Sequence, residues 1–146
     1  MKLKDLYHSD FYAWSQKNSQ ALKNKQFDQI DVEHLVEELE IMGAREKAEL
    51  RSRLKRLLQH LVKWQYQPSH RGRSWRLTIE NQRDELHDLL DDNPSLKSKI
   101  DDELPKAYRQ ALREVEKETG LSQQQLPATA PYTLTQMLDY DFYPDK

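Results

Sequence analysis

A short stretch of the chain, His70-Arg-Gly-Arg-Ser-Trp-Arg76, combines three arginines with a glycine and a tryptophan at the start of an expected helix. A helix start carries roughly half a positive charge and free backbone N–H groups, so arginines are unfavourable there unless an anion lies among them. Gly72 leaves the backbone free to curl around such an anion. The stretch therefore indicates an anion-binding loop. Its candidate binding residues are Arg71, Arg73, Ser74 and Arg76, with Ser74 expected to cap the helix.

This stretch closes a larger basic segment, residues 45–76, which holds ten Lys/Arg against two acids and carries a net charge of +8. The whole chain has a net charge of −2, so the remainder carries −10. Arg56 and Lys63 are expected on the solvated face of a helix in this segment, opposite its leucines. Trp64 and Trp75 could offer aromatic contacts, although packing into the core is the more usual role of such rings.

The anionic partner of the segment could be phosphate, nucleic acid or an acidic protein. It could equally be the chain's own acidic face, formed by Glu33, Glu37 and Glu40, which repels itself and needs a counter-charge. The sequence leaves these alternatives open.

Metal and catalytic sites have weaker support. Asp31 with His34, and Asp84 with His87, have the carboxylate-x-x-His spacing found in some helical-bundle metal sites, but the further inward glutamates of such sites are missing. No nucleophile elbow, phosphate loop or dinucleotide-binding motif is present. We therefore expect no metal, no cofactor and no enzymatic activity, with an undetected carboxylate/His site as the alternative.

The composition favours a soluble helical protein. The length of 146 residues suits one domain, residues 1–146, and three glycines are few for an all-β fold. The chain has no cysteine, which fits a reducing compartment, and no apolar run long enough to span a membrane. A cytoplasmic location is therefore expected.

Apolar periodicity predicts the helices. Asp10 caps a first helix to about residue 25, and Asp31 caps a second. Val32, Leu35, Val36, Leu39 and Met42 form one apolar stripe on this second helix. Gly43 is expected to kink or break the helix before a third one continues to about residue 67.

Three more helices follow. They are expected over residues 74–92, over 94–119 with a kink or division at Pro105, and over 134–139. We predict an all-α single domain of five to six helices, packed as an antiparallel bundle. The aromatic tail around Phe142 and Tyr143 should pack onto it, because these rings carry too much apolar area to leave in water.

Several stretches resemble a known family. They are Leu6-Tyr7 with Asp10-Phe11 and Trp14, Phe27-Asp-Gln-Ile-Asp31, Glu37-Glu-Leu-Glu-Ile-Met-Gly43, His60-Leu-Val-Lys-Trp-Gln-Tyr-Gln-Pro68, Arg73-Ser-Trp75, Pro94-Ser-Leu96, Glu118-Thr-Gly120 and Pro131-Tyr-Thr133. Together they resemble a bacterial, largely cyanobacterial family of uncharacterised proteins, the domain-of-unknown-function family numbered 29. The resemblance implies an all-α domain and no particular function.

The charge segregation leads to a functional expectation. The chain is expected to be a small binding or adaptor module that uses the basic segment and has a protein partner or forms a homodimer. The alternative is binding of nucleic acid, as RNA or single strands, or of another anion through the same segment.

Overall fold

The computed structural model describes residues 2–145, and all regular structure in that range is helical. The predicted all-α fold class is confirmed. The chain divides into two compact units, Met1–Arg45 (unit 1) and Glu46–Lys146 (unit 2), and the division falls inside the longest helix.

Unit 1 contains α1 (Leu3–Ser9), α2 (Phe11–Lys23), the short 3₁₀ helix η1 (Phe27–Gln29) and the first part of α3 (Val32–Tyr66). Asp10 ends α1 and begins α2, and its carboxylate accepts a hydrogen bond from the Ala13 N–H, as predicted. Asp31 caps α3 in the same way, by accepting from the His34 N–H. Aspartate is favoured at this position because its carboxylate satisfies an N–H group that has no partner in the helix.

A buried polar contact joins α2 to the start of α3. The indole Nε1 of Trp14 donates to the Asp31 carboxylate at 2.9 Å, and the Asp31 N–H donates to Asn18 Oδ1 at 2.9 Å. Burial raises the pKa of Asp31, but hydrogen bonds from Trp14 and His34 outweigh it and hold this pKa below its usual range. The buried apolar side chains of unit 1 are few: Tyr7, Trp14 and Ala21.

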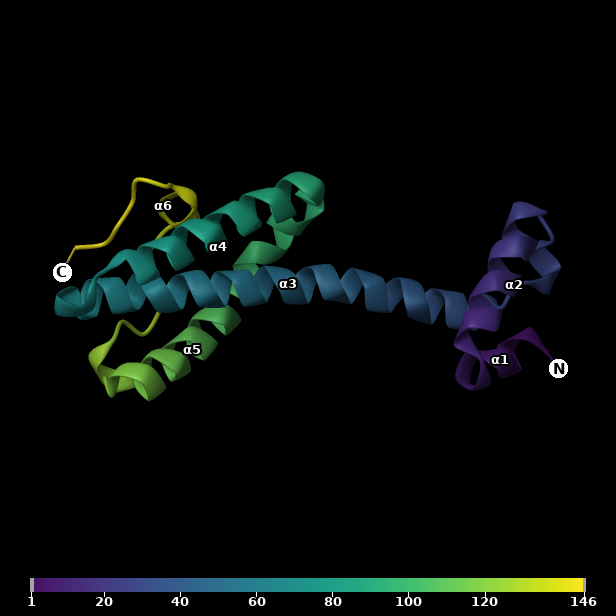
Figure 1. The fold of residues 1–146 in the computed structure, drawn as a ribbon, viewed down its shortest axis with the longest axis horizontal. Coiled ribbons are helices and arrows are strands. Elements are labelled where there is room, and N and C mark those ends of the chain that lie inside the picture. The colour runs from purple at the N-terminus through teal and green to yellow at the C-terminus, as the bar shows by residue number, and fades with distance from the viewer. Residues whose placement is uncertain (1, 146) are drawn as a thin grey trace. The chain divides into compact units, whose positions relative to one another are not determined.

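Unit 2 contains the rest of α3, then α4 (Arg73–Asp92), α5 (Ile100–Thr119) and α6 (Leu134–Leu138), with 3₁₀ helices η2 (Pro68–His70), η3 (Pro94–Lys99) and η4 (Gln123–Gln125). Within it, α3 runs between α4 and α5, and neighbouring helices in the chain reverse direction (Figure 1). This is the predicted antiparallel bundle. Among the helices of residues 2–145, none combines the length and the apolar character that a membrane span requires.

The core of unit 2 encloses the later part of α3 on all sides. Every residue from Leu57 to Trp64 is buried, and five α3 leucines have no exposed surface. Those leucines are Leu50, Leu54, Leu57, Leu58 and Leu61. Burying one such side chain stabilises the fold by about 1.5–3 kcal/mol, so this part of α3 is the centre of the unit.

The C-terminal tail packs onto unit 2, as predicted. Phe142 and Tyr143 are half-buried against the core. The fully buried Arg83 of α4 donates hydrogen bonds to the carbonyls of Met137 and Phe142, each at 2.7 Å. Burial lowers the pKa of the Arg83 guanidinium, because removing its charge from water is costly. The hydrogen bonds to the tail carbonyls offset part of that cost.

Neither helix is broken at Gly43 or at Pro105, where the sequence predicted a kink or a break. Helix α3 continues through Gly43, since its neighbours are helix formers and one glycine costs only about 1 kcal/mol. Helix α5 is likewise not divided at Pro105, which lies near its start, where one lost backbone hydrogen bond is tolerated.

Candidate functional site

Seven of the eight predicted site residues lie between Lys63 and Arg76, where α3 ends and α4 begins, and Arg56 lies earlier on α3. Pro68 follows the end of α3, and Gly72, in an extended conformation, is the N-cap of α4. The expectation that Ser74 caps α4 is wrong: Ser74 lies inside the first turn, where its carbonyl accepts a hydrogen bond from the Thr78 hydroxyl. Helix α4 begins at Arg73, earlier than predicted, because the extended Gly72 is its N-cap. No side chain caps this helix start.

A cavity of about 380 Å³ opens at this junction. Its lining comes from the ends of α3 and α5, the η2 turn and the start of α4: Lys63, Gln67, His70, Trp75, Glu118 and Thr119. We call it the Trp75 cavity. The Trp75 ring is half-buried and packs against the core on one side, while the exposed His70 stacks near it at a centroid distance of 6.4 Å.

Lys63 forms one wall of the cavity and is not solvated, contrary to prediction. It is 6 % exposed, its ammonium donates to Glu118, and its Nζ lies 4.8 Å from the centre of the Trp75 ring. Gln59 donates to the other Glu118 oxygen at 2.7 Å. The end of α5 thus covers the part of this α3 face that holds Gln59 and Lys63, whereas Arg56 on the same face stays exposed.

Arg71 and Arg76 hold the tail and the aromatic rings around it. Arg71 donates to the carbonyls of Trp64, at 2.7 Å, and Pro144, at 3.4 Å. The Arg76 guanidinium lies 5.4 Å from the Trp64 ring centre and 5.0 Å from that of Tyr143, within cation–π range. Trp64 itself is buried, so it is a core residue.

The remaining predicted cations are open to solvent. Arg73 is exposed in the first turn of α4, two residues before Trp75, and Arg56 is exposed on α3. The cavity therefore combines one exposed histidine and a half-buried indole with a lysine whose charge is balanced by Glu118, and Arg73 is not among the residues that line it.

Sequence reasoning missed two residues that organise this region. Glu118 holds Lys63 and Gln59 on α3, and Arg83 holds the tail. The Glu118-Thr-Gly120 stretch of the sequence could have pointed to Glu118, since it marks the end of α5, where the cavity lies. No pattern in the sequence distinguished Arg83 from the surface arginines.

A protein-family model described as "Domain of unknown function DUF29" matches residues 6–143, which is almost the whole chain. The chain belongs to the DUF29 family. The resemblance seen in the sequence is thereby confirmed. No curated protein and no solved structure matches the chain.

The carboxylate-x-x-His pairs of this DUF29 chain are engaged elsewhere. His34 Nδ1 lies 2.7 Å from the Asp31 carboxylate, which also receives the Trp14 indole. His87 bonds to the Leu138 carbonyl, and Asp84 accepts from the Tyr140 hydroxyl. Within residues 2–145, no group of three or more His, Asp or Glu side chains is placed to hold a metal ion.

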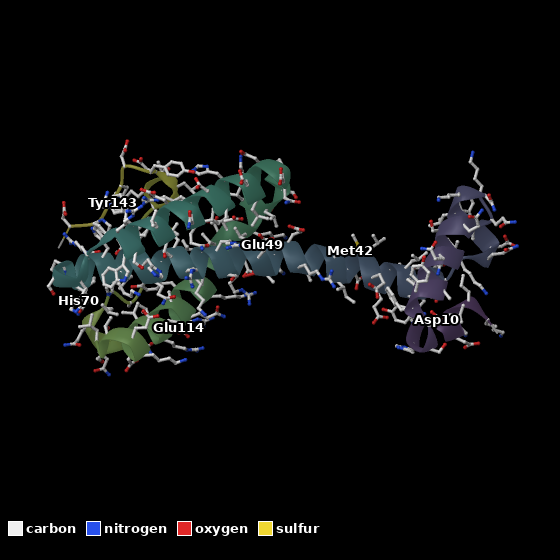
Figure 2. The ribbon with its side chains drawn as sticks, in the orientation of Figure 1. Asp10, Met42, Glu49, His70, Glu114 and Tyr143 are labelled. Atoms are coloured by element: carbon white, nitrogen blue, oxygen red, sulfur yellow. The ribbon has the colours of Figure 1, made fainter. Side chains whose placement is uncertain are left out.

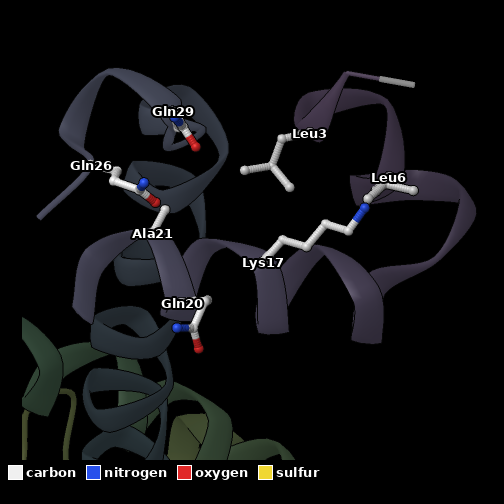
Figure 3. A pocket seen from close by; sticks show the side chains of 7 residues that line it. All are labelled: Leu3, Leu6, Lys17, Gln20, Ala21, Gln26 and Gln29. Carbon is white, nitrogen blue, oxygen red and sulfur yellow. The ribbon is translucent and has the colours of Figure 1, made fainter. Parts of the chain in front are cut away.

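A further hollow of about 290 Å³ lies in unit 1 of the DUF29 chain and is lined by Leu3, Leu6, Lys17, Gln20, Ala21, Gln26 and Gln29. Figure 3 shows the Lys17 side chain extending toward Leu6 rather than toward the glutamines. This hollow offers one cation and neutral amides. It brings together none of the residues predicted for binding, so the Trp75 cavity is the candidate site.

Proposed function

We propose that this DUF29 chain is a non-enzymatic binding module, an adaptor, that captures an acidic segment of a partner protein at the Trp75 cavity. The observation that carries the proposal is the half-buried Trp75 ring in a concave site that His70 also lines. The exposed Arg73 lies two residues before Trp75, in the first turn of α4. Tryptophan and arginine are among the residues that most often anchor protein interfaces.

The charge at the cavity supports an anionic ligand. Both oxygens of Glu118 are already bonded, to Gln59 and Lys63, so this carboxylate does not repel an incoming acid as a free one would. Arg73 stands at the start of α4, where the helix dipole adds positive potential. The positive charge of Arg73 and of the helix start favours a ligand that carries one or more carboxylates. The Trp75 ring favours a ligand that also carries an apolar group.

A protein partner is favoured over nucleic acid by the charge of the whole chain. The net charge is −2 and the isoelectric point about 6.2, whereas a nucleic-acid-binding domain is usually strongly basic. Long-range attraction of a polyanion would be partly cancelled by the acidic remainder of the chain beyond the screening length of about 8 Å at physiological salt. Binding of nucleic acid to the same cavity is the alternative that the binding experiment distinguishes.

The cellular setting is part of the same proposal. A chain without cysteine needs no oxidising compartment, which supports a cytoplasmic location. The resemblance to a largely bacterial family supports a bacterial source. The sequence also left open a homodimer through the basic segment. The exposed apolar side chains, however, gather in unit 1 and not at the Trp75 cavity, so a partner protein is the ligand proposed for the cavity.

Displayed random peptides, selected on the purified chain, test the proposed site. The exposed Arg73→Glu variant reverses the charge without touching the core, and Arg113→Glu, exposed on α5, is its matched control. We expect selected peptides rich in Asp and Glu, with affinity falling about tenfold or more in Arg73→Glu and unchanged in Arg113→Glu, because tenfold corresponds to one lost contact of about 1.4 kcal/mol.

Two outcomes contradict the proposal. One is a set of selected peptides without acidic residues, or with equal affinity for both variants. The other is preferential binding of single-stranded RNA, with log K falling steeply against log salt concentration, which would assign the site to nucleic acid.

A further inference from the structure

Unit 1 leaves most of its large apolar side chains in water. Of the eleven that are exposed in residues 2–145, nine lie in this unit, and only Leu77 and Tyr140 lie in unit 2. The nine are Phe11, Tyr12, Leu22, Phe27, Val32, Val36, Leu39, Ile41 and Met42. A unit of this size buries too little surface to be stable alone, so apolar surface that remains exposed points to a partner.

The exposed side chains on α3 form a single face. Val32, Val36, Leu39 and Met42 follow one another at spacings of four, three and three residues, which places them on one side of a helix. They are 57 %, 48 %, 65 % and 57 % exposed, and Met42 projects from the surface of α3 in Figure 2. The apolar stripe predicted from the sequence is therefore present, but it is not part of a core.

Gly43 lies next to this stripe, and no contact within the chain requires a glycine there. A Cβ added at Gly43 would meet nothing within 4 Å, and the residue has ordinary helical backbone. Alanine would serve the isolated helix better. A glycine on an exposed apolar face is useful where the backbone of a second helix must approach closely.

The charges along α3 identify the second helix. Four acids, Glu33, Glu37, Glu38 and Glu40, precede the first base, Arg45. A parallel copy would set acids beside acids along most of the stripe. An antiparallel copy brings Arg45 of each chain toward the acidic start of the other, and opposes the two helix dipoles.

We propose that the stripe Val32–Met42 binds a second copy of this chain, antiparallel and related by a two-fold axis near Leu39. Val36 of one copy then faces Met42 of the other, as the knobs of a short antiparallel coiled coil do. Beside the stripe, a groove of about 300 Å³ between α2 and α3 is lined by Trp14, Leu22 and Leu35 among others, and it extends the apolar surface onto α2.

The oligomeric state of the full chain, measured by light scattering and sedimentation from low to high micromolar concentration, tests this proposal. Leu39→Glu changes a side chain that contacts solvent, so the variant keeps its fold, which circular dichroism checks. Leu77→Glu, at another exposed leucine, is the matched control. We expect a wild-type dimer, a monomeric Leu39→Glu and a dimeric Leu77→Glu. A wild type that is monomeric throughout, or a Leu39→Glu variant that still dimerises, overturns the proposal.

Disulfide cross-linking tests the orientation, since the chain has no cysteine of its own. In the antiparallel pair, Val36→Cys mixed with Met42→Cys gives the mixed disulfide in preference to either homodisulfide. Homodisulfides at both positions would instead show a parallel pair. The site at Trp75 is separable from this surface: Leu39→Glu keeps its affinity for acidic peptides, and Arg73→Glu stays dimeric.

Discussion

At the residue scale, Glu118 explains how a lysine can be buried beside a tryptophan. Its two oxygens accept hydrogen bonds from Gln59 and Lys63, so the ammonium gains a counter-charge and the amide gains an acceptor. The Lys63 side chain is only 7 % exposed, whereas that of Glu118 is 43 % exposed. The pair therefore lies at the wall of the cavity. There Glu118 is in contact with solvent, whereas the Lys63 ammonium is largely removed from it.

Replacing this carboxylate tests its role. In Glu118→Gln, the side chain loses its negative charge and one of its two acceptor oxygens. Lys63 therefore loses its counter-charge, and Lys63 and Gln59 must share one acceptor. We expect unfolding in urea to show a loss of about 1–3 kcal/mol, the usual cost of leaving a buried polar group unsatisfied.

Glu114→Gln is the control for that measurement, because Glu114 pairs with the exposed Lys117 on the same helix (Figure 2). A surface pair contributes about 0–1 kcal/mol, so this variant should unfold nearly as the wild type does. Equal losses in the two variants would mean that the Lys63 contact contributes nothing beyond a surface pair.

At the element scale, α3 changes character along its length. Its residues 32–45 carry the exposed apolar stripe, whereas Leu57–Trp64 is enclosed on all sides. The polar residues of the enclosed part have specific partners, and His60 bonds through its Nδ1 to the Arg56 carbonyl at 3.0 Å. Burial lowers the pKa of His60, so the neutral ring that can pack in the core is favoured.

The last residues of α5, Glu118 and Thr119, line the cavity, and Gly120 is the C-cap that ends this helix. Gly120 has φ 76° and donates its N–H to the Glu116 carbonyl at 2.9 Å, as a helix C-cap glycine does. Gly120→Ala should cost about 1–2 kcal/mol in thermal or urea unfolding, because a Cβ disfavours left-handed backbone.

Gly120→Asn is the comparison for that variant, since asparagine tolerates the left-handed conformation better than alanine does. Its loss should be clearly smaller. Space is not the limiting factor, because an added Cβ meets nothing within 4 Å. If alanine and asparagine cost the same, backbone conformation would not be the cause.

At the scale of the whole molecule, the two units have very different cores. Within residues 2–145, unit 1 buries three apolar side chains, whereas a single cluster of twenty-one buried apolar residues holds unit 2 together. Stability follows the buried apolar area, so the units should not open with the same free energy.

Hydrogen exchange measured by mass spectrometry, at a concentration too low for self-association, tests this difference. Amides of α1 and α2 should exchange well before those of residues 54–64, because local opening of unit 1 exposes little apolar surface. Equal protection across both ranges would show that the chain unfolds as one cooperative block.

Much of this architecture was predictable from local pattern. The stripes of leucines, the aspartates at positions 10 and 31 and the prolines after helices depend only on neighbours within a few residues. Those interactions are the same whatever the rest of the chain does. The all-α class, most helix ends and the packing of the aromatic tail were accordingly correct.

Which polar residues are buried was decided by tertiary packing. Lys63 and Arg83 look like surface cations in the sequence, and Val36 and Leu39 look like core residues. Burial depends on which helix lies against each face. A lysine can be enclosed where Glu118 meets it, and a leucine stays in water where no helix of this chain covers it.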